Sequence, residues 1–532
     1  MTGSIAAVVF LTLIACLVLT VPIGFSLGIA SLGYILYTKQ LTFGFIAQNM
    51  VTGCDSFPTM AIPFFIFAGE LMGGGGISKR LLNLANVFFG RIQGGLAIVT
   101  VVVCMFFAAI SGSGPATVAA VGGMVIPTML EKGYDKKFVL ALIAAAGSIG
   151  VIIPPSIPMV IYAVTTNSSV STLFLAGFVP GILIGLVLIA YSYFYAKKMG
   201  YKGDDEPFSV KRALRETKEG FWAILSPVII LGGIYGGIFT PTEAAAVSVV
   251  YGLFVGIFIY REVSFKDLRG LLVESGKTTG GIMLIVASAS LFSFVCTKFG
   301  IAQAASDLLG SIAHNQFTFL LIVNVIFLIA GCFIDANSAM YIFIPIMLPV
   351  CKALGYDVVA FGIVATVNLA IGQVTPPVGV NLFVAISVKL KKGMEVDIPK
   401  ISRAVMPMIV ASVMVLLLIT YVPSVSTFLP KALAGEGSYS GNVAASSDSQ
   451  ADSEKDSGPA DFNEIGDYSD LDWKEQTWNF TCSTTETSTW AEGGRKFGEL
   501  VEKATGGKIK VNVYAADQLT NGNQSEGIQA LI

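Results

Sequence analysis

The sequence is poor in charge and in histidine. Charged residues make up 13% of its 532 positions, about half of the roughly 25% typical of soluble proteins. His314 is the one histidine, so histidine-pair metal or protease chemistry is excluded. Seven scattered cysteines include no C-x-x-C pair, which predicts neither a metal site nor a disulfide framework. No G-x-x-x-x-G-K-[ST] loop is present, and this disfavours an ATP-driven pump.

The sequence instead contains many long apolar runs. Hydrophobic residues make up 54% of the chain, the mean hydropathy is +0.75, and runs near the bilayer-spanning length of about 20 residues recur from Gly3 to Pro430. These features predict an all-α polytopic protein of the lipid bilayer. The net charge of −2 gives no electrostatic case for a nucleic-acid partner. The start lacks the basic region of a signal peptide, so it is interpreted as two membrane segments interrupted at Pro22–Gly24.

One segment occurs twice. IGVIIPPSIPMVIYA at Ile149–Ala163 returns as IGQVTPPVGVNLFVA at Ile371–Ala385, and the spacing between matching residues is constant. A Pro-Pro pair removes two N–H donors and disfavours helix at the preceding residue, so each copy predicts a broken helix. The carbonyls thus freed are tolerated in hydrocarbon only where protein, water or an ion satisfies them. A single pair would be interpreted as a simple kink, whereas two copies favour an ion site.

Loop charge orients the two copies. Ala196–Gly220 and Lys389–Arg403 are rich in Lys and Arg, which predicts that both are cytoplasmic. The first copy begins on the basic side and the second ends there, so the copies run in opposite directions. We therefore predict an inverted repeat within a membrane subunit of residues 1–430. The repeats would span about 57–197 and 280–425.

Two hairpins are expected beside the breaks. Leu96–Leu130 and Phe317–Val350 each contain an apolar arm, a polar tip and a returning arm; loop charge does not separate re-entrant hairpins from spanning pairs. Inverted repeats with interrupted helices describe many secondary transporters, whose site lies at the repeat interface near the midplane. Freed carbonyls suit Na⁺, and the N-termini of half-helices suit an anion.

The candidate residues come from the hairpin tips and the breaks, and none is assigned a catalytic role. Na⁺ is the one metal expected, at Ser111, Ser113, Gly114, Thr117, Gly150, Pro154, Asp335, Asn337, Ser338, Gly372, Thr375 and Pro376. The candidates for the substrate path are Ser156 and Asn381. The small residues of the first tip are equally explained by helix packing. Asp335 is costly inside a membrane, although it could also cap a hairpin arm. Glu243 is interpreted as a helix cap.

Several motifs together resemble a known family. GGIYGGIFTPTEAAAVSVVYGL at Gly232–Leu253, the SGSGPAT tip and the two GYD…PP copies resemble the large membrane subunit of tripartite ATP-independent periplasmic (TRAP) transporters, over roughly Ser4–Val425. The resemblance implies an elevator-type, Na⁺-coupled importer of organic acids such as sialic acid or C4-dicarboxylates in the bacterial inner membrane. It also implies a small four-helix membrane subunit and a periplasmic substrate-binding protein as partners, and no cofactor besides the coupling ion.

The C-terminal tail has a different composition. Residues 431–472 are rich in Gly, Ser and Asp and predict a flexible linker. The pattern after it predicts a partial α/β segment: strand 477–483, a helix over 488–504 with the apolar stripe Phe497, Leu500, Val501 and Ala504, and strand 508–514. FGELVEKATGGKIKVNVY resembles the opening of a TRAP substrate-binding protein. Residues 473–532 are therefore expected to be an incomplete fused binding protein on the periplasmic side, too short to close a core.

Two other functions compete with this interpretation. A binding-protein-independent Na⁺/anion symporter of the same inverted-repeat architecture is the alternative within transport, and the tail argues against it. An intramembrane enzyme would need a catalytic constellation, but Asp335 and Asp357 are not evidently paired, so no enzymatic activity is expected. The sequence does not identify which organic acid is carried.

Overall fold

The computed structural model divides into two units, residues 1–446 and 447–532, each of which is described by itself. Most of the predicted linker, from residue 435 onward, and residues 389–396 of the predicted basic loop lie outside the described residues. The structure describes residues 2–19, 21–38, 43–203, 209–300, 310, 312, 315–387, 397–434, 476–482 and 489–515.

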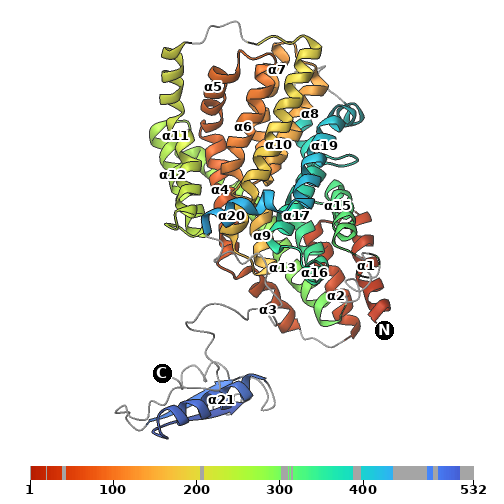
Figure 1. The fold of residues 1–532 in the computed structure, drawn as a ribbon, viewed down its shortest axis with the longest axis vertical. Helices are drawn as coiled ribbons and strands as arrows, with labels where there is room; N and C mark the ends of the chain where they lie inside the picture. The colour runs from red at the N-terminus through yellow and green to blue at the C-terminus, as the bar shows by residue number, and fades with distance from the viewer. Residues whose placement is uncertain are drawn as a thin grey trace, which may run out of the picture. The chain divides into compact units, whose positions relative to one another are not determined.

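All regular elements of the membrane unit in its described residues are helices (Figure 1). Seven of these helices are long and apolar enough to cross a membrane, or eight if one bent pair counts as a span, which confirms the predicted fold class. Its first half contains α1 (Thr2–Val18), α2 (Ile23–Thr38), α3 (Phe43–Cys54), η1 (Pro58–Met60), α4 (Ala61–Gly74), α5 (Ile77–Phe89), α6 (Gly95–Ser111), α7 (Gly114–Glu131), α8 (Lys136–Gly147), η2 (Ser148–Val151), α9 (Ile157–Thr166) and α10 (Val170–Met199). Its second half contains α11 (Val210–Tyr235), α12 (Pro241–Phe254), η3 (Val255–Ile259), α13 (Phe265–Lys298), α15 (Gln316–Phe333), α16 (Ala336–Ala353), α17 (Val358–Gly372), α18 (Val380–Ser387), α19 (Ile398–Tyr421) and α20 (Ser424–Ala434).

The constant spacing of the two copies relates whole elements as well as the Pro-Pro segments. The hairpin α6–α7 corresponds to α15–α16, the broken pair α8–α9 to α17–α18, and α10 to α19. Gly133 and Gly355 both adopt positive φ where the hairpins end, at 80° and 69°. Asp135 and Asp357 then occupy the N-cap positions of α8 and α17. The same turn chemistry therefore starts the broken helix in each repeat.

Contacts between the repeats come in reciprocal pairs. Helix α9 packs on α16, and its counterpart α18 packs on α7. Likewise α8 contacts α19, and α17 contacts α10. Figure 1 shows α6 and α7 in the upper half of the membrane unit and α15 and α16 in the lower half. Reciprocal contacts of this kind arise when a two-fold rotation exchanges the halves, so the tertiary structure supports the inverted repeat inferred from loop charge.

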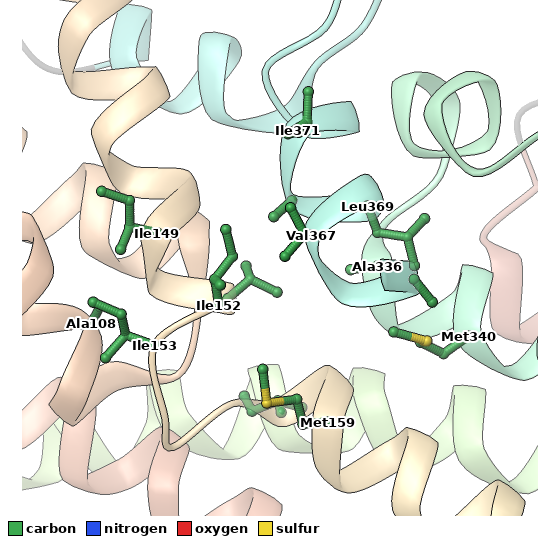
Figure 2. Close-up of a cluster of buried hydrophobic side chains, with 14 of the residues drawn as sticks. Ala108, Ile149, Ile152, Ile153, Met159, Ala336, Met340, Val367, Leu369 and Ile371 are labelled. Atoms are coloured by element: carbon green, nitrogen blue, oxygen red, sulfur yellow. The ribbon is translucent and has the colours of Figure 1, made fainter. Parts of the chain in front are cut away.

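The core where the repeats meet is apolar (Figure 2). Ile152 from the first break, Met159 on α9, Met340 on α16 and Val367 on α17 belong to one cluster, and each is 3% exposed or less. The first break is thus embedded in close-packed side chains. The second break is more open, with Pro377 exposed and Thr375, Pro376 and Val378 half-buried.

One helix continues through a polar stretch of the sequence. Arg261–Lys277 is polar, yet α13 runs unbroken from Phe265 over 34 residues. A capping box of Ser264 and Asp267 starts it, and exposed Lys277 pairs with Glu274 at 2.7 Å. In the first repeat the equivalent stretch is split into α3 and α4, with a bend of 66°. The split falls at Pro58, which has no N–H to continue the helix.

The C-terminal unit confirms the predicted strand–helix–strand order. Strand β1 (Gln476–Cys482) pairs in parallel with β2 (Ile509–Ala515), and α21 (Thr489–Ala504) connects them. The predicted apolar stripe of the helix is partly wrong, because Phe497 is 50% exposed. Gly498 packs on the sheet instead; a Cβ there would lie 3.1 Å from Val511 Cβ. Close approach of helix and strand requires the glycine, which turns the larger Phe497 outward.

Candidate functional site

A cavity of about 370 Å³ lies in the membrane unit where both hairpin tips and both breaks meet. Helices α4 and α13 complete its wall. The two repeats therefore contribute equivalent elements to one central space. Its lining includes Glu70 and Gly73 of α4, Ser111, Gly112, Ser113, Gly114 and Pro115 of the first tip, Val151, Ile157 and Pro158 of the first break, Leu271, Thr278 and Ile282 of α13, Asp335 and Asn337 of the second tip, and Gln373 of the second break.

The first tip concentrates oxygen atoms. Gly112 at φ +62° lets α6 end and α7 begin within three residues. Ser111 Oγ and Thr117 Oγ1 share a hydrogen bond of 2.9 Å, and Thr117 Oγ1 donates to Ser113 O at 2.8 Å. A Cβ at Gly150 in the adjoining break would overlap Thr117 Oγ1. The hydroxyl cluster and the break are therefore in direct contact, and oxygen ligands of this kind suit a hard cation.

The second tip is built around a carboxylate. Asp335 is the N-cap of α16: Oδ1 accepts from Asn337 N at 2.9 Å and from Ser338 N at 3.1 Å, and Oδ2 accepts from Ser338 Oγ at 2.5 Å. Its equivalent in the first repeat is Ser113, the N-cap position of α7. The helix dipole and three donors stabilise the charge of Asp335 inside the membrane unit.

Each break is tied to the hairpin of its own repeat by a backbone hydrogen bond. Ile157 N donates to Gly112 O at 3.3 Å, and Gly379 N donates to Cys332 O at 3.2 Å. Ile157 and Gly379 occupy equivalent positions of the two repeats. Pro154–Pro155 and Pro376–Pro377 free these N–H groups by ending the preceding helices. Backbone carbonyls of the hairpins therefore accept hydrogen bonds from N–H groups that have no partner within the broken helices.

Five of the predicted residues line the cavity: Ser111, Ser113, Gly114, Asp335 and Asn337. The others are not part of its lining. Thr117, Gly150 and Pro154 are buried beside the first tip, and Ser338 is buried beside the second. Gly372 packs against Gly331, while Thr375 and Pro376 follow it in the second break. The two residues predicted for the substrate path, Ser156 and Asn381, are both 0% exposed and lie off the cavity wall.

Ser156 has a clear structural role. Its Oγ donates to Val151 O at 2.6 Å and accepts from Met159 N at 3.4 Å, so it closes the first break and caps α9. A serine directly after the Pro154–Pro155 pair supplies the acceptor that the new helix needs.

Three polar side chains of the cavity lining were not among the predicted ion or substrate residues: Glu70, Thr278 and Gln373. Gln373 stands where the first repeat has Val151, so a polar residue inside an otherwise apolar repeat was the available signal. Glu70 and Asp335 are the charged side chains of the lining, and no lysine or arginine belongs to it in the described residues. An anion entering this cavity would therefore be met by helix N-termini, hydroxyls, amides and any bound cation.

Comparison with known proteins assigns this architecture. The model of the tripartite ATP-independent periplasmic transporter, DctM component, matches residues 10–425. The chain belongs to this family. It is a multi-pass transporter permease of a bacterial inner membrane, and the family works together with a small membrane subunit and a periplasmic binding protein.

The TRAP permease has relatives with different named substrates. It is 48% identical over 412 residues to the isethionate TRAP transporter permease protein DctMQ of Oleidesulfovibrio alaskensis, covering 77% of this chain and 64% of that protein. It is 41% identical to the C4-dicarboxylate large permease DctM of Vibrio cholerae, covering 81% and 98%. It is 37% identical to the sialic acid large permease SiaM of the same species, covering 78% and 96%. The chain thus spans slightly less than two thirds of the first relative.

A solved structure shares the fold. The YdaH transporter of Alcanivorax borkumensis aligns with a TM-score of 0.53 at 13% identity, covering 73% of this chain and 88% of that one. At this identity the likeness concerns the fold alone.

Proposed function

We propose that this TRAP permease is a Na⁺-coupled secondary importer of small organic acids. The observation that carries the proposal is the convergence of two hairpin tips and two breaks on one cavity. Inverted-repeat transporters bind substrate and coupling ion between such elements. The cavity is large enough for a small molecule, because sites of that kind begin at about 300 Å³. The hydroxyl cluster of the first tip and the oxygens around Asp335 are the proposed Na⁺ ligands.

The substrate class follows from the relatives. Isethionate, C4-dicarboxylates and sialic acid appear in their names, and all are anions that carry a sulfonate or a carboxylate. Because the described lining has no lysine or arginine, such an anion needs another positive partner, and bound Na⁺ supplies it. Isethionate is the first acid to test, because a relative 48% identical carries its name.

The partners belong to the same proposal. A small four-helix membrane subunit would complete the scaffold, and a periplasmic binding protein would deliver the acid. The C-terminal unit, with its parallel strand–helix–strand, would be the start of a fused binding protein held on the periplasmic side. A transport domain containing the two hairpins would slide against the scaffold as an elevator.

The test is uptake into proteoliposomes that contain the full chain, its small subunit and the binding protein of the system. An inward Na⁺ gradient is expected to drive accumulation of labelled isethionate or succinate without ATP, and a K⁺ gradient of equal size is not. Uptake at the same rate without Na⁺ would overturn the coupling. Full-rate uptake without any binding protein would favour the alternative, a binding-protein-independent Na⁺/anion symporter.

A further inference from the structure

Gln373 has a different environment at each end of its carboxamide. The residue belongs to the second break, lines the central cavity and is only 5% exposed. Its Oε1 is buried and has no hydrogen-bond partner in the part of the chain that the structure describes. Since the residue reaches the cavity while its oxygen is buried, the NH₂ end is the one that faces the open space.

The oxygen end lies against the opposite repeat. A Cβ built at Gly114, the first residue of α7, would be 2.5 Å from Gln373 Oε1 and 3.1 Å from Asn381 Nδ2. Asn381 is 0% exposed, and its Oδ1 is also buried without a partner among the described residues. Two unpaired carboxamide oxygens therefore belong to side chains that pack on the same glycine.

Unpaired acceptors of this kind need an explanation, because burying them without a donor is costly. A hard cation accepts neutral carboxamide oxygens as ligands. On the cavity side, an acid group needs donors, and a carboxamide supplies two N–H groups. The absence of lysine and arginine from the described lining makes such neutral donors more important.

We propose that Gln373 couples cation and substrate, with Oε1 as a ligand of the bound Na⁺ and Nε2 as a donor to the acid group of the substrate. This rests on the proposed Na⁺-driven uptake of organic acids. The cation holds the carboxamide with its nitrogen toward the cavity, so the donor is presented only when the cation is bound. By linkage, the acid then tightens Na⁺ binding by the same factor. Val151 stands at the equivalent position of the first break, so this coupling comes from the second repeat.

The test separates the two ends of the side chain. Purified full chain is titrated with isethionate, and in parallel with succinate, in NaCl or in choline chloride, and binding is followed by the rise in unfolding temperature. Wild type is expected to respond to Na⁺ alone, and to the acids only with Na⁺ present. Gln373→Met should raise the apparent Kd for the acid about 10- to 100-fold, as expected for a lost hydrogen bond to a charged group. It should also flatten the dependence of that Kd on Na⁺.

Gln373→Glu keeps an oxygen ligand but loses the donor, so it should retain the Na⁺ response and lose the response to the acid. Gln316→Met makes the same chemical change at an exposed position at the start of α15, and it should behave as wild type. Unfolding in choline chloride reports whether each variant is folded.

The outcomes distinguish the inference from the function. Wild-type Kd and Na⁺ dependence in Gln373→Met would overturn the coupling role alone, and so would a Gln373→Glu variant that binds the acids normally. A wild type that responds to neither Na⁺ nor these acids would overturn the proposed function, and the inference with it.

Discussion

At the residue scale, glycines set how closely the hairpins approach the breaks. Gly331 of α15 and Gly372 of α17 lie backbone to backbone, since a Cβ on either would come within 2.9 Å of the other's Cα. Gly150, the repeat equivalent of Gly372, packs against Thr117 and Ser113 at the tip of the first hairpin. Each break thus has a glycine where it contacts the hairpin of its own repeat.

Gly114 gives a sharp test of this packing. In Gly114→Ala, the added methyl would overlap Gln373 Oε1 and crowd Val151, so we expect a loss of about 1–3 kcal/mol of stability together with weaker acid binding. Gly123→Ala is the control on the same helix, because nothing lies within 4 Å of its Cβ position. It should be neutral or stabilise by up to about 1 kcal/mol. Thermal unfolding measures the stability of both variants, and titration with isethionate or succinate measures their substrate affinity. Equal stability and equal affinity of the two variants would contradict the packing argument.

At the element scale, caps begin the helices that surround the cavity. Asp335 starts α16 and Ser156 starts α9, each by accepting from backbone N–H groups. A helix that begins inside a membrane has no water to satisfy its first N–H groups. These caps therefore make it possible for a helix to start at the depth of the breaks.

Asp335→Asn distinguishes the role of Asp335 as the N-cap of α16 from the role of its negative charge. Asparagine caps as well as aspartate, so stability should fall by no more than about 1 kcal/mol, the contribution of a negative charge at a helix N-terminus. The Na⁺ concentration for half-maximal uptake should rise, because a charged ligand near the ion is lost. Asp335→Ala removes the cap too and should cost a further 0.5–2 kcal/mol or so. Unchanged Na⁺ dependence in Asp335→Asn would leave Asp335 as a cap alone.

Ser156→Ala tests the first break as an element. Loss of the N-cap of α9 and of the bond to Val151 O should cost about 0.5–2 kcal/mol, because both groups are buried. Ser169→Ala removes the cap of α10 at an exposed bond and should cost less, since water replaces the hydroxyl. The unfolding temperatures of the two variants in NaCl measure these losses of stability. An equal loss of stability in the two variants would argue against a special role of the break.

At the scale of the whole molecule, loop charge together with the two-fold relation of the repeats predicts opposite orientations of the repeats in the membrane. The basic loop after α10 should be cytoplasmic and the end of α20 periplasmic. A fluorescent protein fused after Gly203 should fluoresce, and alkaline phosphatase fused after Ala434 should be active, each with the other reporter silent at that site. The opposite pattern at either site would overturn the orientation, and the periplasmic tail with it.

Much of this architecture could be predicted from the sequence because its signals are local. Pro154–Pro155 and Pro376–Pro377 break helices wherever they occur, and the turn at Gly133–Asp135 recurs at Gly355–Asp357 with the same spacing. The length of α13 was not predicted, because the polar stretch Arg261–Lys277 carries no apolar signal for a span. The structure shows one continuous helix that begins at its cap and includes the exposed Glu274–Lys277 pair.

The sequence by itself determined the membrane helices, the two breaks, the hairpins and the inverted repeat, because apolar length, proline and loop charge act through the adjacent chain and the bilayer. Only the tertiary structure decided which of these residues meet. In the structure, Asp335, Ser111 and Gln373 line one cavity, whereas Ser156 and Asn381 lie outside its wall. The physical reason is that a cavity is made by contacts between segments far apart in the chain, and local sequence does not encode which side chain faces inward.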